Sequence, residues 1–114
     1  MAETRPVYLK LRDVIAAAIL DGTYKEGEML PSVRALAAKE GANPLTVAKA
    51  YQGFQNSGLV EVQRGVGMFV AEGAISRLRS DERKNFFENV WPPVVEQMKR
   101  IGITPGELLE KVDD

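Results

Sequence analysis

The sequence predicts a mainly α-helical protein with one small β-hairpin, and three features of the apolar pattern support this fold class. Up to residue 57, apolar side chains recur every three or four residues, which is the spacing of one helical face. From Leu59 to Val70 the spacing becomes two, around a glycine-bearing turn. After Gly73 the helical spacing returns. We therefore expect one domain over residues 1–73 and a helical tail over residues 74–114.

The first helix is expected over residues 6–21. Its apolar stripe recurs at spacings of three and four residues: Tyr8, Leu11, Ile15 and Ile19. Pro6 suits the start of this helix and Gly22 its end. A loop over residues 23–29, with Gly27 as its turn residue, leads to the next helix.

Two short helices around a tight turn are expected between Leu30 and Phe54. Ser32 is a suitable N-cap for the first of them, and Gly41 ends it. Asn43 caps the second helix, whose first residue is Pro44. The second helix buries Val47, Ala50, Tyr51 and Phe54 and turns outward Leu45, Thr46, Lys49 and Gln52. An outer face that can hydrogen-bond and neutralise phosphate is what a DNA recognition helix requires, so this segment predicts a helix-turn-helix.

A β-hairpin is expected next. Val60 and Val62 alternate with polar residues, and Phe69-Val70 belong to a second strand after the turn at residues 64–67. Three helices followed by a hairpin is the order of a winged helix-turn-helix. Arg64 at the tip of the wing could reach a minor groove or a phosphate.

The tail has helical spacing interrupted by Pro92-Pro93. Proline in a helix interior causes a kink or break, so we expect one helix to about Asn89 and another over about 93–101. A capping box that begins at Thr104 predicts a last helix over residues 105–112. Some 40 residues are too few for a separate core. A second copy of the chain is the best partner for the apolar side chains expected at this interface: Phe86, Phe87, Val90, Trp91, Val94 and Met98.

Composition excludes several classes of function. The chain has no cysteine and no histidine, so we expect no disulfide, no metal site, no cofactor and no catalytic residue. It has no apolar run long enough to span a bilayer and no signal-peptide pattern, so we expect a cytoplasmic protein. The net charge of −1, with eight bases and eight acids in residues 1–73, argues weakly against DNA binding. Distribution matters more than the sum, and Arg34, Lys49 and Arg64 fall on segments expected to face DNA.

As a set, these motifs resemble the GntR family of bacterial transcription regulators over about 60 residues. The matching residues are Tyr8, Ile15, Ile19, Gly22, Gly27, Leu30-Pro31-Ser32, Arg34, Leu36-Ala37, Thr46-Val47, Ala50, Gly58-Leu59-Val60, Gly65, Gly67 and Phe69-Val70. The short tail and the stretch from Asn43 to Tyr51 are similar to the YtrA-type branch, whose tail serves dimerisation. The resemblance implies a homodimeric repressor that binds a palindromic operator, commonly near transporter genes.

The resemblance also implies which residues contact DNA. Arg34 is the foremost candidate, followed by Thr46 and Arg64-Gly65, with Ser32, Lys49 and Gln52 beside them. The sequence departs from the wider family at Pro44, where many members have arginine, and at Ala48, where others have a long polar residue. Base specificity is therefore left to Lys49 and Gln52, or largely to Arg34.

Simpler interpretations stay open for several of these residues. Arg34, Lys49 and Arg64 could be ordinary solvated side chains, and Thr46 could only cap its own helix. Leu45 could touch a thymine methyl group or pack on the wing. The tail aromatics could line a small-molecule pocket, and an effector is left unidentified. The alternative function is a winged helix that binds only other proteins, and an enzyme is the remote third.

Overall fold

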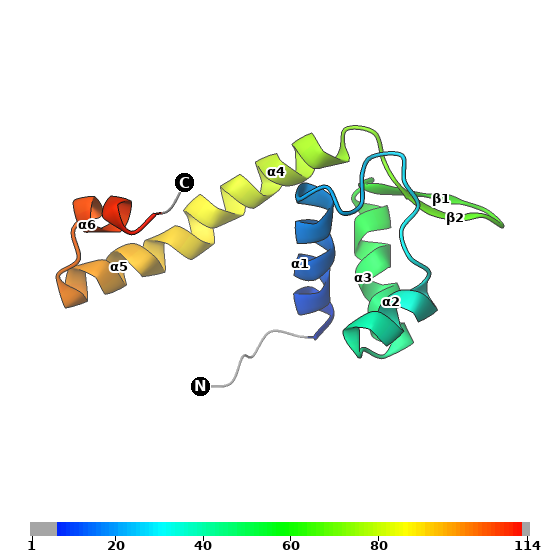
Figure 1. The fold of residues 1–114 in the computed structure, drawn as a ribbon, viewed down its shortest axis with the longest axis horizontal. Coiled ribbons are helices and arrows are strands. Elements are labelled where there is room, and N and C mark those ends of the chain that lie inside the picture. The colour runs from blue at the N-terminus through cyan, green and yellow to red at the C-terminus, as the bar shows by residue number, and fades with distance from the viewer. Residues whose placement is uncertain (1–6, 113–114) are drawn as a thin grey trace. The chain divides into compact units, whose positions relative to one another are not determined.

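The computed structural model describes residues 7–112, which form helices and one hairpin in the predicted order. The elements are α1 (Val7–Leu20), α2 (Val33–Glu40), α3 (Pro44–Asn56), β1 (Val60–Gln63), β2 (Gly67–Val70), α4 (Ala74–Asn85), the π-helical turn η1 (Phe86–Val90), α5 (Trp91–Ile101) and α6 (Pro105–Glu110) (Figure 1). The chain divides into two compact units between Arg79 and Ser80. Each unit is described separately below.

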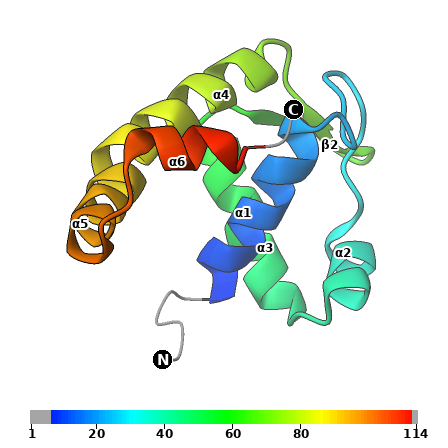
Figure 2. The same ribbon diagram turned by 60° about the vertical axis from the view of Figure 1, so that its left-hand side comes forward.

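The N-terminal unit is built on α1 and α3, which pack side by side, with α2 packed against α3 (Figures 1 and 2). Its core takes apolar side chains from every element of the unit. The largest fully buried ones are Phe54, Ile15, Ile19, Leu36, Leu59, Leu78, Val47 and Val70. Leu78 and Ala74 are part of this core, so the first turns of α4 belong to the N-terminal unit.

Both helices of the helix-turn-helix are capped as the sequence predicts. Ser32 Oγ accepts a hydrogen bond from Ala35 N at 3.1 Å, and Gly41 ends α2 in the left-handed conformation with φ 63°. Asn43 Oδ1 accepts from Leu45 N at 2.8 Å, and Pro44 is the first residue of α3. A residue without Cβ adopts the left-handed conformation at little cost, which allows the tight turn between the helices.

The wing is an antiparallel hairpin in which Val60 pairs with Val70 and Gln63 with Gly67. The segment before α2, expected to be only a loop, adds hydrogen bonds along the other edge of β2. Leu30 N donates to Met68 O at 2.8 Å, and Val70 N donates to Glu28 O at 2.9 Å. These bonds attach the base of the wing to the start of the helix-turn-helix.

The C-terminal unit corrects one prediction. Pro92-Pro93 do not separate two helices, because the backbone stays helical from α4 through η1 into α5. Trp91 N donates to Phe86 O, five residues back, which is the hydrogen bond of a π turn. The prolines are then the second and third residues of α5, directly after this wider turn. The predicted break at the prolines is therefore replaced by a wider turn at residues 86–90.

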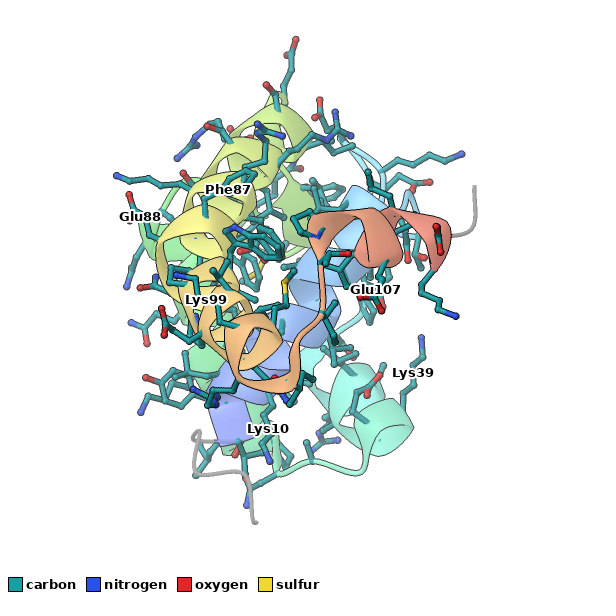
Figure 3. All side chains as sticks on the ribbon, turned by 90° about the vertical axis from the view of Figure 1, so that its left-hand side faces the viewer. Lys10, Lys39, Phe87, Glu88, Lys99 and Glu107 are labelled. Carbon is teal, nitrogen blue, oxygen red and sulfur yellow. The ribbon has the colours of Figure 1, made fainter. Side chains whose placement is uncertain are left out.

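The chain reverses after α5 at Gly102, which has φ 73°, and α6 begins at Pro105 as predicted. Thr104 Oγ1 accepts from Glu107 N, and Glu107 Oε1 accepts from Thr104 N, each at 3.2 Å, which completes the capping box. Figure 3 labels Phe87, Glu88 and Lys99 along η1 and α5, and Glu107 on α6. In residues 7–112, no helix is long and apolar enough to cross a membrane.

Candidate nucleic-acid interface

The outer face of α3 carries the predicted recognition residues. Leu45, Lys49 and Gln52 are exposed, and Thr46 is half-buried. Within the described part of the chain, the side chains of Thr46 and Gln52 make no hydrogen bond, so both keep their polar groups for a ligand. The side-chain oxygen of Asn43 caps α3, so Thr46 does not serve as the cap.

Arg34 is the second residue of α2 and is exposed. Its guanidinium has no acidic partner and no hydrogen bond among residues 7–112. Ser32, two residues earlier, uses its oxygen to cap α2 but keeps its hydroxyl hydrogen as a donor. The start of α2 therefore presents a cation with five donors and one further hydroxyl donor.

Lys49 is directed differently from its neighbours on α3. Its ammonium Nζ lies 4.0 Å from the ring centroid of Tyr8 on α1, a cation–π contact. The contact holds the charge of Lys49 against a side chain of α1. Lys49 is thus placed at the side of the recognition face next to α1.

The wing tip carries Arg64 and Gly65. Val66 N donates to Gln63 O at 2.9 Å and closes the turn, and Gly65 has φ 79°, a conformation that favours glycine. Arg64 is exposed and has no acidic partner among the described residues. A second unpaired arginine therefore stands at the end of the hairpin.

A buried tyrosine ties the recognition helix to the start of α2. The Tyr51 hydroxyl donates to the Pro31 carbonyl at 2.8 Å, and the side chain is only 3% exposed. Burial, with a smaller contribution from Tyr24, raises the pKa of Tyr51 above its ordinary value of 10.0. Pro31 lies three residues before Arg34, so this bond helps fix the position of Arg34 relative to α3.

Two charged residues that the sequence analysis did not single out hold the first turn of α4. Glu26 accepts hydrogen bonds from Gly73 N at 2.9 Å and Ile75 N at 3.0 Å, and these bonds lower the pKa of its carboxyl. The Arg77 guanidinium donates to the Gly58 carbonyl at 3.2 Å and to the Ser57 carbonyl at the end of α3. The partners lie 19 to 49 residues away in sequence, so no local pattern indicates them.

The tail residues predicted for dimerisation lie in η1 and α5. Phe86, Phe87 and Val90 are 44%, 55% and 44% exposed. Phe86 packs edge-on against Phe87, with ring centroids 5.3 Å apart, and is stacked on Trp91 at 6.3 Å. Trp91 and Val94 are half-buried, and Met98 is 7% exposed. The structure therefore divides the predicted set into an exposed part and a part already covered within one chain.

Comparison with known proteins identifies the domain. The family of bacterial regulatory proteins named gntR matches residues 7–70, which include the helix-turn-helix and the wing. The chain belongs to the GntR family. The match covers every residue predicted to contact DNA.

Relatives and solved structures extend the similarity into the tail. The HTH-type transcriptional repressor YtrA of Bacillus subtilis is 34% identical over 112 residues, covering 96% of this chain and 80% of that protein. An uncharacterised HTH-type regulator of the same organism, YhcF, is 33% identical over 96% of this chain and 88% of its own length. A GntR family regulator from Listeria monocytogenes matches with TM-score 0.78 and 29% identity over 99% of this chain and 100% of that one.

The similar structures include complexes with operator DNA. The DNA-binding domain of AraR, in complex with operator ORX1, matches with TM-score 0.56 and 26% identity over 60% of this chain and 82% of that chain. The comparisons confirm the predicted winged helix-turn-helix with a helical tail. As a member of the GntR family, this chain is a transcriptional regulator with a DNA-binding helix-turn-helix. The family and the relatives are regulators, so the chain is not an enzyme.

Proposed function

We propose that the chain is a repressor that binds a palindromic operator as a homodimer. The observation that carries this proposal is a pair of exposed arginines, Arg34 at the start of α2 and Arg64 at the tip of the wing, which lack acidic partners among the described residues. Repression follows from occupation of the operator, and the similarity to the repressor YtrA supports it. The resemblance to YtrA-type regulators makes transporter genes the proposed targets.

The proposed contacts follow from the chemistry of each side chain. Arg34 forms the paired hydrogen bonds that a guanidinium makes with guanine O6 and N7. Thr46 and Gln52 hydrogen-bond base edges in the major groove. Ser32, Lys49 and the Gly65 backbone N–H contact phosphates, and Arg64 contacts the minor groove or the backbone.

The test compares the Arg34→Ala variant with wild type on a selected operator and on a random duplex, by gel shift at one salt concentration. Loss of a bidentate guanine contact costs about 1–3 kcal/mol of discrimination. We expect the operator to lose far more affinity than the random duplex. Lys39→Ala is the matched control, since Lys39 lies in the last turn of α2 and projects from the helix (Figure 3). Equal losses of affinity on both duplexes would show that Arg34 contacts a phosphate and does not read a base.

Dimerisation through the tail is supported by its exposed apolar surface. Of the described tail residues from 80 onward, Met98 alone falls among the buried apolar side chains, so this unit lacks a core of its own. A second copy that covers Phe86, Phe87 and Val90 would remove this surface from water, and a two-fold pair would set the two recognition helices about 34 Å apart.

The oligomeric state tests this step. Val90→Asp introduces a charge where the partner copy would pack, and we expect sedimentation to show monomers at concentrations where wild type is dimeric. Ser80→Asp, on the exposed part of α4, is the control for added charge and should stay dimeric. A dimeric Val90→Asp protein would place the interface elsewhere.

The second candidate, a winged helix that binds only proteins, is favoured by the neutral charge balance of residues 1–73. The salt dependence of binding distinguishes the two functions. For DNA binding, the logarithm of the binding constant falls linearly with log[salt], with a slope of roughly −0.9 for each phosphate neutralised. Steep salt dependence with sequence selectivity supports the regulator. Absence of any duplex binding at low salt supports the protein-binding function.

A further inference from the structure

We propose that Leu45 contacts the C5-methyl group of a thymine in the operator and that this contact is one determinant of sequence specificity. The inference rests on the proposed DNA binding and adds to it one base, thymine, and the apolar side chain that recognises it, Leu45. Recognition helices contact base edges with their N-terminal residues, and Leu45 is the second residue of α3.

Leu45 is 80% exposed, more than any other large apolar side chain in the described part of the molecule. Packing on the wing, the alternative that the sequence left open, is not observed. An apolar groove of about 350 Å³ lies between the wing and the start of α2, with Val33, Tyr51, Val62 and Met68 in its lining, and Leu45 does not line it. The side chain therefore points to solvent on the recognition face.

The backbone under Leu45 is fixed before any ligand binds. The Leu45 N–H donates to Asn43 Oδ1 at 2.8 Å, and the next two amides, of Thr46 and Val47, donate to the Asn43 carbonyl at 2.9 and 3.2 Å. Pro44, immediately before it, has a restricted φ. A preorganised side chain loses little freedom on binding, which makes a small apolar contact count toward affinity.

The neighbouring side chains favour an A·T base pair here. Ala48, one turn further along the same face, is exposed and short, so it lets the helix approach the groove floor. Lys49 would be the competing long side chain, but its ammonium lies over Tyr8 on α1. Gln52 offers an amide that pairs with adenine N6 and N7, and an apolar side chain fits the thymine methyl. The outer face of α3 thus suits thymine and adenine, and guanine recognition falls to Arg34.

The experiment removes the methyl group from the DNA and the side chain from the protein. An operator selected from a random duplex library by the wild-type chain is remade with deoxyuridine in place of thymine, one position of a half-site at a time. Affinities are measured by fluorescence anisotropy for wild type, Leu45→Ala and Leu45→Met. Val14→Ala, which truncates an exposed apolar residue on α1, is the matched control.

We expect one deoxyuridine position to weaken wild-type binding about fourfold, the equivalent of one buried carbon group. Leu45→Ala should lose a similar factor on the unmodified operator and be insensitive to deoxyuridine at that position. Leu45→Met and Val14→Ala should keep the wild-type sensitivity. Thermal unfolding of each variant checks that the exposed substitutions leave the fold intact.

Two results would overturn the inference, and they are distinguishable. Sequence-selective binding with the same deoxyuridine profile for wild type and Leu45→Ala would remove Leu45 from base recognition and leave the proposed function standing. Failure of the wild-type chain to select any duplex would overturn the proposed DNA binding together with the thymine contact.

Discussion

Replacing Tyr51 by phenylalanine tests how the recognition helix is held to the start of α2. The substitution removes only the hydroxyl that donates to the Pro31 carbonyl at 2.8 Å and keeps the ring that fills the core. A neutral hydrogen bond contributes about 0.5–1.5 kcal/mol net. We expect Tyr51→Phe to lower the free energy of unfolding by about 1 kcal/mol, or roughly 4–8 °C in Tm for a domain of this size.

Chemical denaturation followed by the far-UV circular dichroism of the helices measures this difference. Tyr24→Phe is the matched control, since Tyr24 also packs against the core and its hydroxyl makes no hydrogen bond among residues 7–112. The pH dependence gives a second readout. Because the folded pKa of Tyr51 is raised, its contribution is complete below pH 10.0 and is lost as the pH rises above that value.

Tyr51→Phe should therefore flatten part of the alkaline loss of stability, and Tyr24→Phe should flatten it less, because Tyr24 is the smaller cause of the raised Tyr51 pKa. It should also weaken operator binding slightly, because Pro31 leads directly to Ser32 and Arg34. Equal stability of the two phenylalanine variants, with the same alkaline slopes, would show that the hydrogen bond to Pro31 contributes nothing and would refute this reasoning.

Three further substitutions test the base of α4 and the conformation of two glycines. Glu26→Gln should reduce the loss of stability in acid, because the hydrogen bonds in the folded state lower the pKa of the Glu26 carboxyl below 4.5. The stability that this carboxylate contributes is present above pH 4.5 and is lost as the pH falls through the folded pKa. Urea titrations at a series of pH values measure this loss, and an unchanged dependence of stability on acid pH would contradict the prediction. Gly41→Ala should destabilise the protein by about 1 kcal/mol, because φ is 63° there. Gly53 lies in the helical backbone of α3, and an added Cβ would meet no atom within 4 Å, so Gly53→Ala should stabilise the protein by about 0.4–1 kcal/mol. Calorimetry that found the two alanine substitutions to shift Tm in the same direction would contradict this comparison.

Local rules were enough to predict most of the fold. Caps, glycines and apolar spacing act within four or five residues, so Ser32, Gly41, Asn43 and the Thr104 capping box were all predicted and are all observed. The site residues followed from the same helical periodicity, because the outer face of α3 is defined once its buried face is known. Their contacts with DNA stay predictions.

The features that sequence analysis missed depend on residues far apart in the chain or on competing local effects. Glu26 lies 47 and 49 residues before the amides that it caps, and Arg77 reaches back 19 and 20 residues. The error at Pro92-Pro93 has a different cause. Proline disrupts the regular hydrogen bonds of a helix interior, and here a π turn at residues 86–90 accommodates the two prolines without ending the helical backbone.

Lys49 has two possible roles that an experiment can distinguish: its charge contacts a DNA phosphate, or it serves only to stabilise the protein. Its ammonium lies 4.0 Å from the Tyr8 ring centroid, yet the side chain is exposed and stands at the edge of the recognition face. If Lys49 neutralises a phosphate, Lys49→Gln should reduce the slope of log K against log[salt] by roughly 0.9 per chain. Gln keeps the length and polarity of the side chain while removing the charge.

Tyr8→Leu is the partner experiment, because it removes the ring and leaves the lysine charge. We expect Tyr8→Leu to keep the salt slope and to change affinity little, since a released ammonium can still reach the backbone. A Lys49→Gln protein with an unchanged salt slope and a lower Tm would mean that the cation stabilises α1 against α3 and does not touch DNA. The phosphate contacts would then come from Arg64 and the start of α2, which the salt slopes of the corresponding alanine variants would measure directly.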